Sequence, residues 1–232
     1  MDRQHPVISV IIPVYNEEKA LPATLNQFQG QSGAYEIIAV DGGSADRTCD
    51  IVVRYPGIHL LRAPKGRASQ MNAGARLARG EWLLFLHADT LLPPDALLQL
   101  ADLQHASRCQ AGGFRHRFSG SDWRLRLISV LDNYRCQRTR VIYGDQAMFV
   151  RRQLFHQLGG FPNQPILEDV AFCQQLLAVT EPVILDAYVL TDSRKFVKMG
   201  IWRSLARVLG ILIRLELGRP VAATHPFFQD VR

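Results

Sequence analysis

Apolar residues in the first hundred positions come in short continuous runs that end in polar turns. Runs rich in Val, Ile and Leu predict strands buried on both faces, as in a parallel sheet. The predicted strands cover residues 7–15, 35–40, 58–62 and 82–86. Helices are expected near residues 18–29, 45–54 and 66–78, and Pro93-Pro94 opens a fourth,. This alternation predicts an α/β fold with a doubly wound, mostly parallel sheet and helices on both faces.

The pattern is less regular after residue 106. Strands are expected at residues 110–118, 143–150 and 182–190, and helices at 122–138, 167–179 and 194–217. The chain shows no repeat, low-complexity tract or linker, so we expect a single domain. Its expected parts are one half over residues 7–106, a second half over 107–192, and a C-terminal basic amphipathic helix with its tail over 193–232.

The C-terminal segment has its own chemistry. Residues 194–219 hold seven Lys or Arg residues and one Glu, with an apolar side that includes Trp202. A basic amphipathic helix with a Trp is typical of contact with an anionic membrane surface. The alternative is a helix packed on the domain with a solvated basic face.

Composition narrows the partners. The 232 residues are 47% apolar, with a net charge of +6 and a pI near 9.4, which favours an anionic partner such as a nucleotide. No nucleic-acid-binding motif occurs, so no nucleic-acid partner is predicted. The four dispersed cysteines argue against a zinc site. The sequence has no signal peptide pattern and no apolar run long enough for a transmembrane helix. The expected location is therefore cytoplasmic, and a peripheral position on the inner membrane face is the alternative.

Asp41 and Asp89 each stand at the carboxyl end of a predicted strand. Ligands of parallel sheets bind beyond these ends, so both carboxylates should lie at one edge of the sheet. The Gly42-Gly43 pair lets the backbone approach a ligand closely, and Asp41 can accept hydrogen bonds from a base or ribose. The alternative for this segment is an ordinary strand–helix turn with a capping side chain.

The segment His87-Ala88-Asp89 points to a metal. Mg²⁺ and Mn²⁺ prefer oxygen ligands, and diphosphate oxygens would complete the shell around a carboxylate placed here. Asp89 is therefore the predicted metal ligand. The alternative makes Asp89 a helix cap and His87 a packed, hydrogen-bonded residue.

Two further segments place charge at predicted helix starts. Residues 65–74, with Arg67 and Asn72, bring basic and polar side chains to a helix N-terminus, which suits a phosphate; a solvated basic turn is the alternative. Glu168-Asp169 opens another helix. A carboxylate there can act as general base toward an acceptor hydroxyl, or it can simply complement the helix dipole.

The order of these segments resembles family 2 glycosyltransferases, which have the GT-A fold. The matching pieces are SVIIPVYNEE (9–18), VDGGSADRT (40–48), KGRASQMNAG (65–74), FLHADT (85–90), GGF (159–161) and ILEDVAF (166–172). The third and fourth are most similar to a bacterial subgroup, the rSAM/selenodomain-associated transferases. The resemblance implies an inverting, non-processive glycosyltransferase that moves a hexosyl or related group from a nucleotide-diphosphate-sugar to an acceptor hydroxyl.

The resemblance also implies roles for the candidate residues. Asp169 would be the catalytic base, with Glu168 as the close alternative, and Asp89 would bind a divalent cation, Mn²⁺ or Mg²⁺. The donor, a UDP-, GDP- or dTDP-sugar, would bind in the first half and the acceptor, lipid-linked in one version, in the second. The predicted nucleotide-sugar contacts are Pro13, Tyr15, Glu17, Asp41, Gly43, Arg67, Asn72, His87 and Ala88.

Two departures from the family pattern keep alternatives open. His87 replaces the first Asp of the DxD motif, which leaves one carboxylate for the metal and keeps a non-catalytic nucleotide-binding or membrane-associated regulator in view. Residues 191–196 lack the Gln and Trp of the QxxRW motif of processive members, which favours transfer of one sugar. A nucleotidyltransferase would need a Gly-rich basic loop after the first strand, where residues 13–18 are acidic instead.

Overall fold

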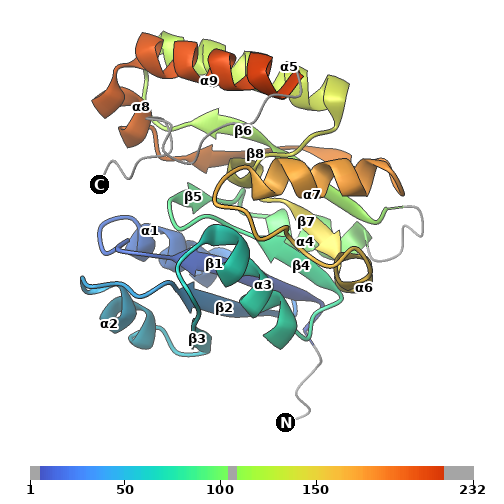
Figure 1. Cartoon of the computed structure of the whole chain (residues 1–232). Coiled ribbons are helices and arrows are strands. Elements are labelled where there is room, and N and C mark those ends of the chain that lie inside the picture. The colour runs from blue at the N-terminus through green and yellow to red at the C-terminus, as the bar shows by residue number, and fades with distance from the viewer. Residues whose placement is uncertain (1–5, 104–108, 217–232) are drawn as a thin grey trace.

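A computed structural model describes residues 6–103 and 109–216. One mixed sheet of eight strands runs through the molecule (Figure 1). The strands are β1 (Ile8–Val14), β2 (Tyr35–Asp41), β3 (Ile58–Arg62), β4 (Trp82–Phe85), β5 (Thr90–Leu91), β6 (Ala111–Phe118), β7 (Phe149–Arg151) and β8 (Val183–Thr191). The α-helices are α1 (Leu21–Asn26), α2 (Thr48–Val53), α3 (Arg67–Leu77), α4 (Ala96–Asp102), α5 (Trp123–Thr139), α6 (Arg152–Gln157), α7 (Glu168–Leu177), α8 (Arg194–Met199) and α9 (Ile201–Glu216).

The strand order is β3-β2-β1-β4-β7-β6-β8-β5. The first four strands pair in parallel, and β6 also pairs in parallel with β8. The pairs β4–β7, β7–β6 and β8–β5 are antiparallel. The α/β prediction is therefore confirmed, with the antiparallel pairs confined to the side of the sheet beyond β4.

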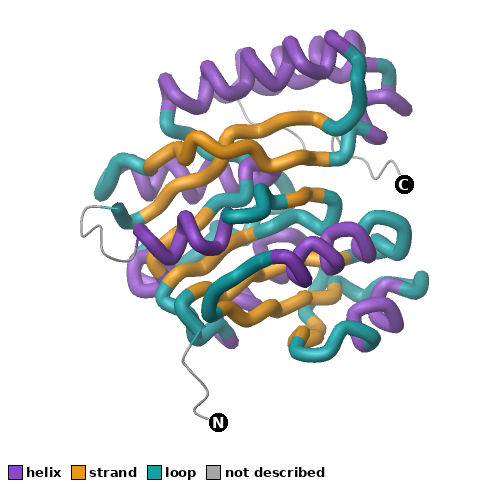
Figure 2. Tube along the Cα trace, turned by 180° about the vertical axis from the view of Figure 1, so that it is seen from behind, coloured by secondary structure: helices purple, strands orange, loops and turns teal. Residues whose placement is uncertain are grey.

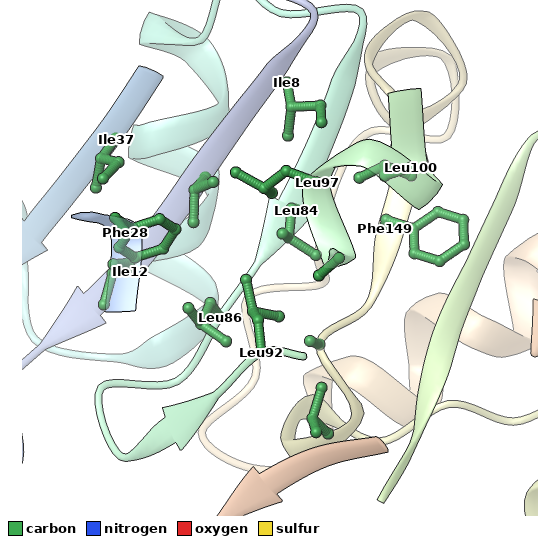
Figure 3. Packing of buried hydrophobic residues seen from close by; sticks show 14 of the residues in the cluster. Ile8, Ile12, Phe28, Ile37, Leu84, Leu86, Leu92, Leu97, Leu100 and Phe149 are labelled. Carbon is green, nitrogen blue, oxygen red and sulfur yellow. The ribbon is translucent and has the colours of Figure 1, made fainter. Parts of the chain in front are cut away.

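Helices cover both faces of the sheet, which Figures 1 and 2 show from opposite sides. The core accordingly has two large clusters. One packs α1 and α4 on the sheet through residues such as Ile12, Leu84 and Leu97 (Figure 3). The other packs α3, α6 and α7 on the opposite face through Met71 and Phe172. Every residue of β1 is buried, as its continuous apolar run predicts.

The prediction of a strand over residues 143–150 is wrong for its first half. A 3₁₀ turn occupies Gly144–Gln146, and Gln146 Oε1 accepts a hydrogen bond from the Tyr143 amide at 3.0 Å. This local bond competes with strand pairing, so β7 begins only at Phe149. Helix α6 and the two-residue strand β5 were not expected.

The prediction of one helix over residues 194–217 is also wrong. Gly200 has a φ of +82° and ends α8, and α9 begins at the next residue. A left-handed backbone conformation suits glycine and interrupts a helix. Residue 217 and the predicted tail to residue 232 lie outside the described residues. Within the described part of the chain, no helix is long and apolar enough to cross a bilayer.

Candidate active site

Asp41 ends β2 and folds its carboxylate into the turn that follows. Its two oxygens accept the Gly43 and Ser44 amides, each at 3.0 Å, and Gly43 has the positive φ, +91°, that such a turn requires,. Burial opposes ionisation of Asp41, but the hydrogen bonds from Ser44, Gly43 and Cys49 outweigh it and hold the pKa below its ordinary value. The Asp41 carboxylate thus stabilises this turn, and its contact with a nucleobase stays a prediction.

The loop after β1 is fastened to the loop after β2. The amides of Asn16 and Glu17 donate to Ser44 Oγ at 2.9 Å and to Thr48 Oγ1 at 2.7 Å. Pro13, the last predicted contact before the loop, pairs with β2 inside the sheet. Tyr15 and Gly43 therefore stand on one edge of the sheet. We call residues 13–18 and 41–48 the β1–β2 rim.

Helix α3 begins against this rim. Gln70 Nε2 donates to the carbonyls of Val14 at 2.8 Å and Val40 at 2.7 Å, which ties the helix to both strands. Lys65, just before the helix, holds its ammonium 3.9 Å from the centroid of the Tyr15 ring. The rim therefore presents the Tyr15 ring beside the Lys65 ammonium, an arrangement that suits a nucleobase and a phosphate,.

Arg67 and Asn72 use their side chains to connect α3 to the second half of the chain. The Arg67 guanidinium forms an ion pair with Glu168, with Nε 2.9 Å from Oε1. The Asn72 amide group donates to the Phe161 carbonyl at 2.8 Å and accepts from its amide at 2.9 Å. The predicted nucleotide contacts of both residues stay predictions, because the contacts seen are with protein.

Asp169 and His87 converge on Gly144, although they come from distant parts of the chain. Asp169 Oδ2 accepts the Gly144 amide at 2.7 Å, and Oδ1 accepts the Val170 amide at 2.8 Å. A methyl group added to Gly144 would lie 2.6 Å from His87 Nε2 and 3.3 Å from Asp169 Oδ2. The absence of a side chain at position 144 thus lets both groups approach the same point of the backbone. Ala88, the residue after His87, is buried, and its carbonyl accepts a hydrogen bond from Thr24 Oγ1 at 2.6 Å.

Asp89 lies beside Asp192, a residue that the sequence pattern did not single out. The Asp192 amide donates to the Asp89 carbonyl at 3.1 Å, next to the pairing of Thr90 with Thr191 between β5 and β8. Burial, and then the negative charge of Asp192, raise the pKa of Asp89. Asp192 directly follows β8, so the strand-end argument used for Asp41 and Asp89 would also have found it.

Asp145 is a second acid that sequence reasoning missed. It follows Gly144, and its Oδ2 lies 3.6 Å from Nε2 of the buried His116. Burial raises the pKa of Asp145, against the attraction of His116. Burial also raises the pKa of Glu168, which Arg67 opposes and Asp169 reinforces. We call these acids, Asp89, Asp145, Glu168, Asp169 and Asp192, the acidic corner.

The residues of the acidic corner fit a divalent cation that arrives with a diphosphate. Among the residues that the structure describes, no group of three His, Cys, Asp or Glu side chains could hold a metal alone. Mg²⁺, however, commonly uses one or two carboxylates together with phosphates and waters. Asp89 and Asp192 supply such a pair, and a cation would relieve the repulsion that raises the pKa of Asp89,.

Comparison with curated proteins places the chain among transferases of sugars. It is 40% identical over 104 residues to the PGL/p-HBAD biosynthesis glycosyltransferase of Mycobacterium tuberculosis, covering 41% of each chain. It is 31% identical over 177 residues to the undecaprenyl-phosphate 4-deoxy-4-formamido-L-arabinose transferase of Serratia proteamaculans, covering 70% of this chain and 54% of that one. The chain therefore matches only about half, or less, of the length of these relatives.

Solved structures share the fold at low identity. TarS of S. aureus, residues 1–349, superposes with a TM-score of 0.65 and 20% identity over 94% of this chain and 67% of that one. The mannosyltransferase PcManGT of Pyrobaculum calidifontis, in complex with GDP-Man and Mn²⁺, gives 0.68 and 21% over 98% and 69%. Both support the GT-A architecture.

The family model described as glycosyl transferase family 2 matches residues 9–159, more than half of the chain. The matched span includes the β1–β2 rim, the start of α3, and the His87, Asp89 and Gly144 positions. The narrower rSAM/selenodomain-associated subgroup stays a prediction. The chain belongs to glycosyl transferase family 2.

Proposed function

We propose that the chain transfers a single sugar, with inversion, from a nucleotide-diphosphate-sugar to an acceptor. The observation that carries the proposal is the convergence of Asp169, His87 and the Asp89–Asp192 pair at one corner of the sheet, next to the rim that holds Tyr15. The ligands bound in the similar structures support the donor class, since PcManGT is in complex with GDP-Man and TarS with UDP-GlcNAc.

Asp169 is the proposed base, in preference to Glu168. Glu168 is neutralised by its ion pair with Arg67, whereas no Lys or Arg nitrogen lies within 4 Å of Asp169 among the described residues. Asp169 removes the proton of the acceptor hydroxyl while that oxygen attacks the anomeric carbon. The bond from that carbon to the diphosphate breaks on the opposite face, and the nucleoside diphosphate leaves as an anion that needs no proton.

The donor is held by the β1–β2 rim and the acidic corner together. The rim, with Tyr15 and Gly43, receives the nucleoside. Asp89 and Asp192 would hold the divalent cation, which would neutralise charge on the diphosphate leaving group. His87 takes the place of a carboxylate beside Asp89, so fewer negative charges face the diphosphate than a full DxD motif would provide.

A lipid-linked acceptor is the proposed acceptor class. Several relatives carry a lipid phosphate in their names, including undecaprenyl-phosphate and dolichyl-phosphate transferases. The reacting group of such an acceptor is either a phosphate or a hydroxyl, and the two differ in their need for a base. A phosphate acceptor is already ionised near pH 7, so it needs no base, whereas a hydroxyl acceptor depends on Asp169.

The test is release of nucleoside diphosphate from UDP-, GDP- and dTDP-sugars with Mn²⁺, in parallel with thermal unfolding in the presence of each nucleoside diphosphate. We expect one diphosphate to raise the Tm, since a ligand of the folded state stabilises it, and the matching sugar donor to be consumed. Binding without turnover over the whole panel would instead favour the regulator. Pyrophosphate release from a nucleoside triphosphate and a sugar phosphate would favour the nucleotidyltransferase.

A further inference from the structure

Exposed apolar side chains are concentrated on three helices, α5, α8 and α9. The structure describes sixteen large apolar side chains that are exposed, and nine of them belong to α5, α8 and α9. Trp123 is 64% exposed and Trp202 is 52% exposed. Isolated exposed apolar residues are ordinary, but a gathering of this kind marks an interaction surface.

The exposed residues form one stripe on α5 and a second on α9. On α5 the stripe follows positions 123, 127, 130, 131 and 134. On α9 the exposed positions 202, 206, 209, 210 and 213 repeat the same spacing, with Ala206 and Gly210 as its small members. Spacings of three, four and seven residues put each set on one side of its helix.

Each helix therefore has two apolar sides. The inner sides pack together in a cluster that includes Leu125, Ile128 and Ile201. The outer stripes are joined where the rings of Trp123 and Trp202 meet, with centroids 6.2 Å apart. Figure 1 shows α5 and α9 as the outermost layer over β6 and β8, and Figure 2 shows the same layer from behind. We call the two stripes with α8 the α5–α9 face.

The positive charge of the chain lies on the same helices. Helices α5, α8 and α9 contain ten Lys or Arg residues and two acidic residues, a net charge of +8, whereas the whole chain has +6. The rest of the chain therefore carries −2. Arg126, Lys198, Arg203 and Arg214 are exposed, and within the described ranges none of them has a carboxylate within 4 Å.

A hollow of about 400 Å³ lies where α5 meets the α8–α9 junction. Its lining combines the cations Arg124, Lys198 and Arg203 with the apolar Val197 and Trp202. Arg124 also forms an ion pair with Asp122 at 2.6 Å. Cations beside an apolar ring suit a phosphate group that is attached to a hydrocarbon chain.

We infer that the α5–α9 face docks on an anionic lipid bilayer. The Trp pair and the two stripes enter the interface, while the cations attract the lipid phosphates. A second copy of this chain is a poorer occupant, because a two-fold contact would place one basic face, with the exposed cations Arg126, Lys198 and Arg203, against another,. The inference reaches beyond the C-terminal segment, since α5 supplies half of the face. It is independent of the proposed function.

The face is directly connected to the acidic corner. Helix α8 begins at Arg194, whose amide donates to Asp192 Oδ1 at 2.7 Å. Asp192 in turn holds the Asp89 carbonyl. A bilayer bound to the face would thus present its headgroups within one short helix of the corner, where the proposed lipid-linked acceptor would react.

The test is flotation of the full chain with vesicles, either of phosphatidylcholine alone or with about 30% phosphatidylglycerol. We expect the wild type to float with the anionic vesicles and to remain at the bottom with neutral ones. Trp123→Ser/Trp202→Ser and Lys198→Glu/Arg203→Glu should each weaken binding at least about tenfold. All four positions are at the surface, and thermal unfolding verifies that the variants are folded.

Matched controls lie on the opposite half of the molecule. Val53→Ser/Leu77→Ser removes exposed apolar groups, and Arg54→Glu/Arg76→Glu reverses exposed charges; both should float like the wild type. The inference is overturned if the wild type does not float, or if the controls lose binding as strongly as the variants of the face. Sedimentation as a dimer that the Trp variant abolishes, without flotation, would assign the face to a second copy instead.

Discussion

Three acids in β2 and the loop after it, and three acids of the acidic corner, have opposite pKa shifts. The pKa values of Glu36, Asp41 and Asp46 are lowered, because hydrogen bonds from backbone amides and neighbouring side chains outweigh burial. Those of Asp89, Asp145 and Glu168 are raised, because burial dominates and other carboxylates are close.

The difference distinguishes acids whose ionised form is stabilised by the fold from acids whose ionised form is destabilised by burial and by neighbouring carboxylates. A carboxylate that receives several hydrogen bonds stabilises the folded chain when it is ionised. A carboxylate that faces another carboxylate costs stability, and such arrangements are typical of sites that bind cations or move protons. Acid-to-amide substitutions in the two groups should therefore have different consequences.

The largest effect is expected at Asp169. Asp169→Asn should lower kcat for a hydroxyl acceptor by about 10²- to 10⁴-fold, the usual contribution of a general base. The Tm should fall as well, because the carboxylate accepts the Gly144 and Val170 amides and an Asn side chain can accept only one of them,. Initial rates of nucleoside diphosphate release measure it. Glu36→Gln is the matched acid-to-amide control and should change kcat less than about threefold, because Glu36 binds Arg79 and Ser9 far from the corner. Equal rate losses in the two variants would contradict the assignment of Asp169 as the base.

A pair of glycine substitutions sharpens the contrast. An added methyl group would lie 2.6 Å from the nearest atom at both Gly144 and Gly80. At Gly144 the neighbour is the His87 ring, which can swing aside, so Gly144→Ala should reduce kcat about tenfold or more at nearly unchanged Tm. At Gly80 the neighbour is the backbone of Ser9, so Gly80→Ala should cost about 1–3 kcal/mol of stability.

Rates and thermal unfolding of both alanine variants, measured side by side, check this pair. If Gly144→Ala unfolds as readily as Gly80→Ala and both lose activity in proportion, Gly144 has only a packing role.

Glu36→Gln should destabilise the protein at neutral pH by about 1–3 kcal/mol, because charge-assisted hydrogen bonds to Ser9 and Arg79 are lost,. The pKa of Glu36 is lowered in the folded chain, so its stabilisation is present above the ordinary value of 4.5 and is lost as the pH falls through the folded pKa,. Urea unfolding between about pH 3 and 8 should show the two proteins converging at the acid end. A constant difference over this range would rule out the ionised Glu36 as its source.

The smallest effect, of opposite sign, is expected at Asp145. Its pKa is raised in the folded chain, so the ionised form costs stability at neutral pH and the cost vanishes below the ordinary value of 3.8,. Asp145→Asn should raise the Tm at pH 7 by about 2–4 °C, equivalent to about 1 kcal/mol for a chain of this size. Differential scanning calorimetry measures the shift, and a lower Tm would mean that Asp145 belongs with the stabilising acids.

The parallel half of the fold could be predicted because its signal is local. The strands β1 and β4 are continuous apolar runs, β2 and β3 are mostly apolar, and a run such as residues 7–15 is enough to mark a strand buried on both faces,. The same strand-end rule selected Asp41 and Asp89. Glu168-Asp169 was selected as a carboxylate pair at a predicted helix start, and the family pattern, whose ordered motifs extend into the second half, implied the role of base for Asp169.

The remainder depends on contacts between distant residues. Strand β5 has two residues, too few for any periodicity, and exists because Thr90 meets Thr191. The approach of both His87 and Asp169 to Gly144 leaves no trace in local composition. The break at Gly200 did have a local signal, an isolated glycine within a helical pattern, and the length of the apolar periodicity around it obscured that signal.

The β5–β8 pairing also sets the order in which the molecule can assemble. The pairings among β1 to β4 join residues no farther along the chain than 85, whereas the Asp89–Asp192 contact closes a loop of about a hundred residues. Contacts of such long range form late, because the chain must first lose the entropy of closing the loop. During synthesis, the pairing of β1 to β4 can therefore precede the acidic corner, and the Asp89–Asp192 contact forms only after β8 has been made.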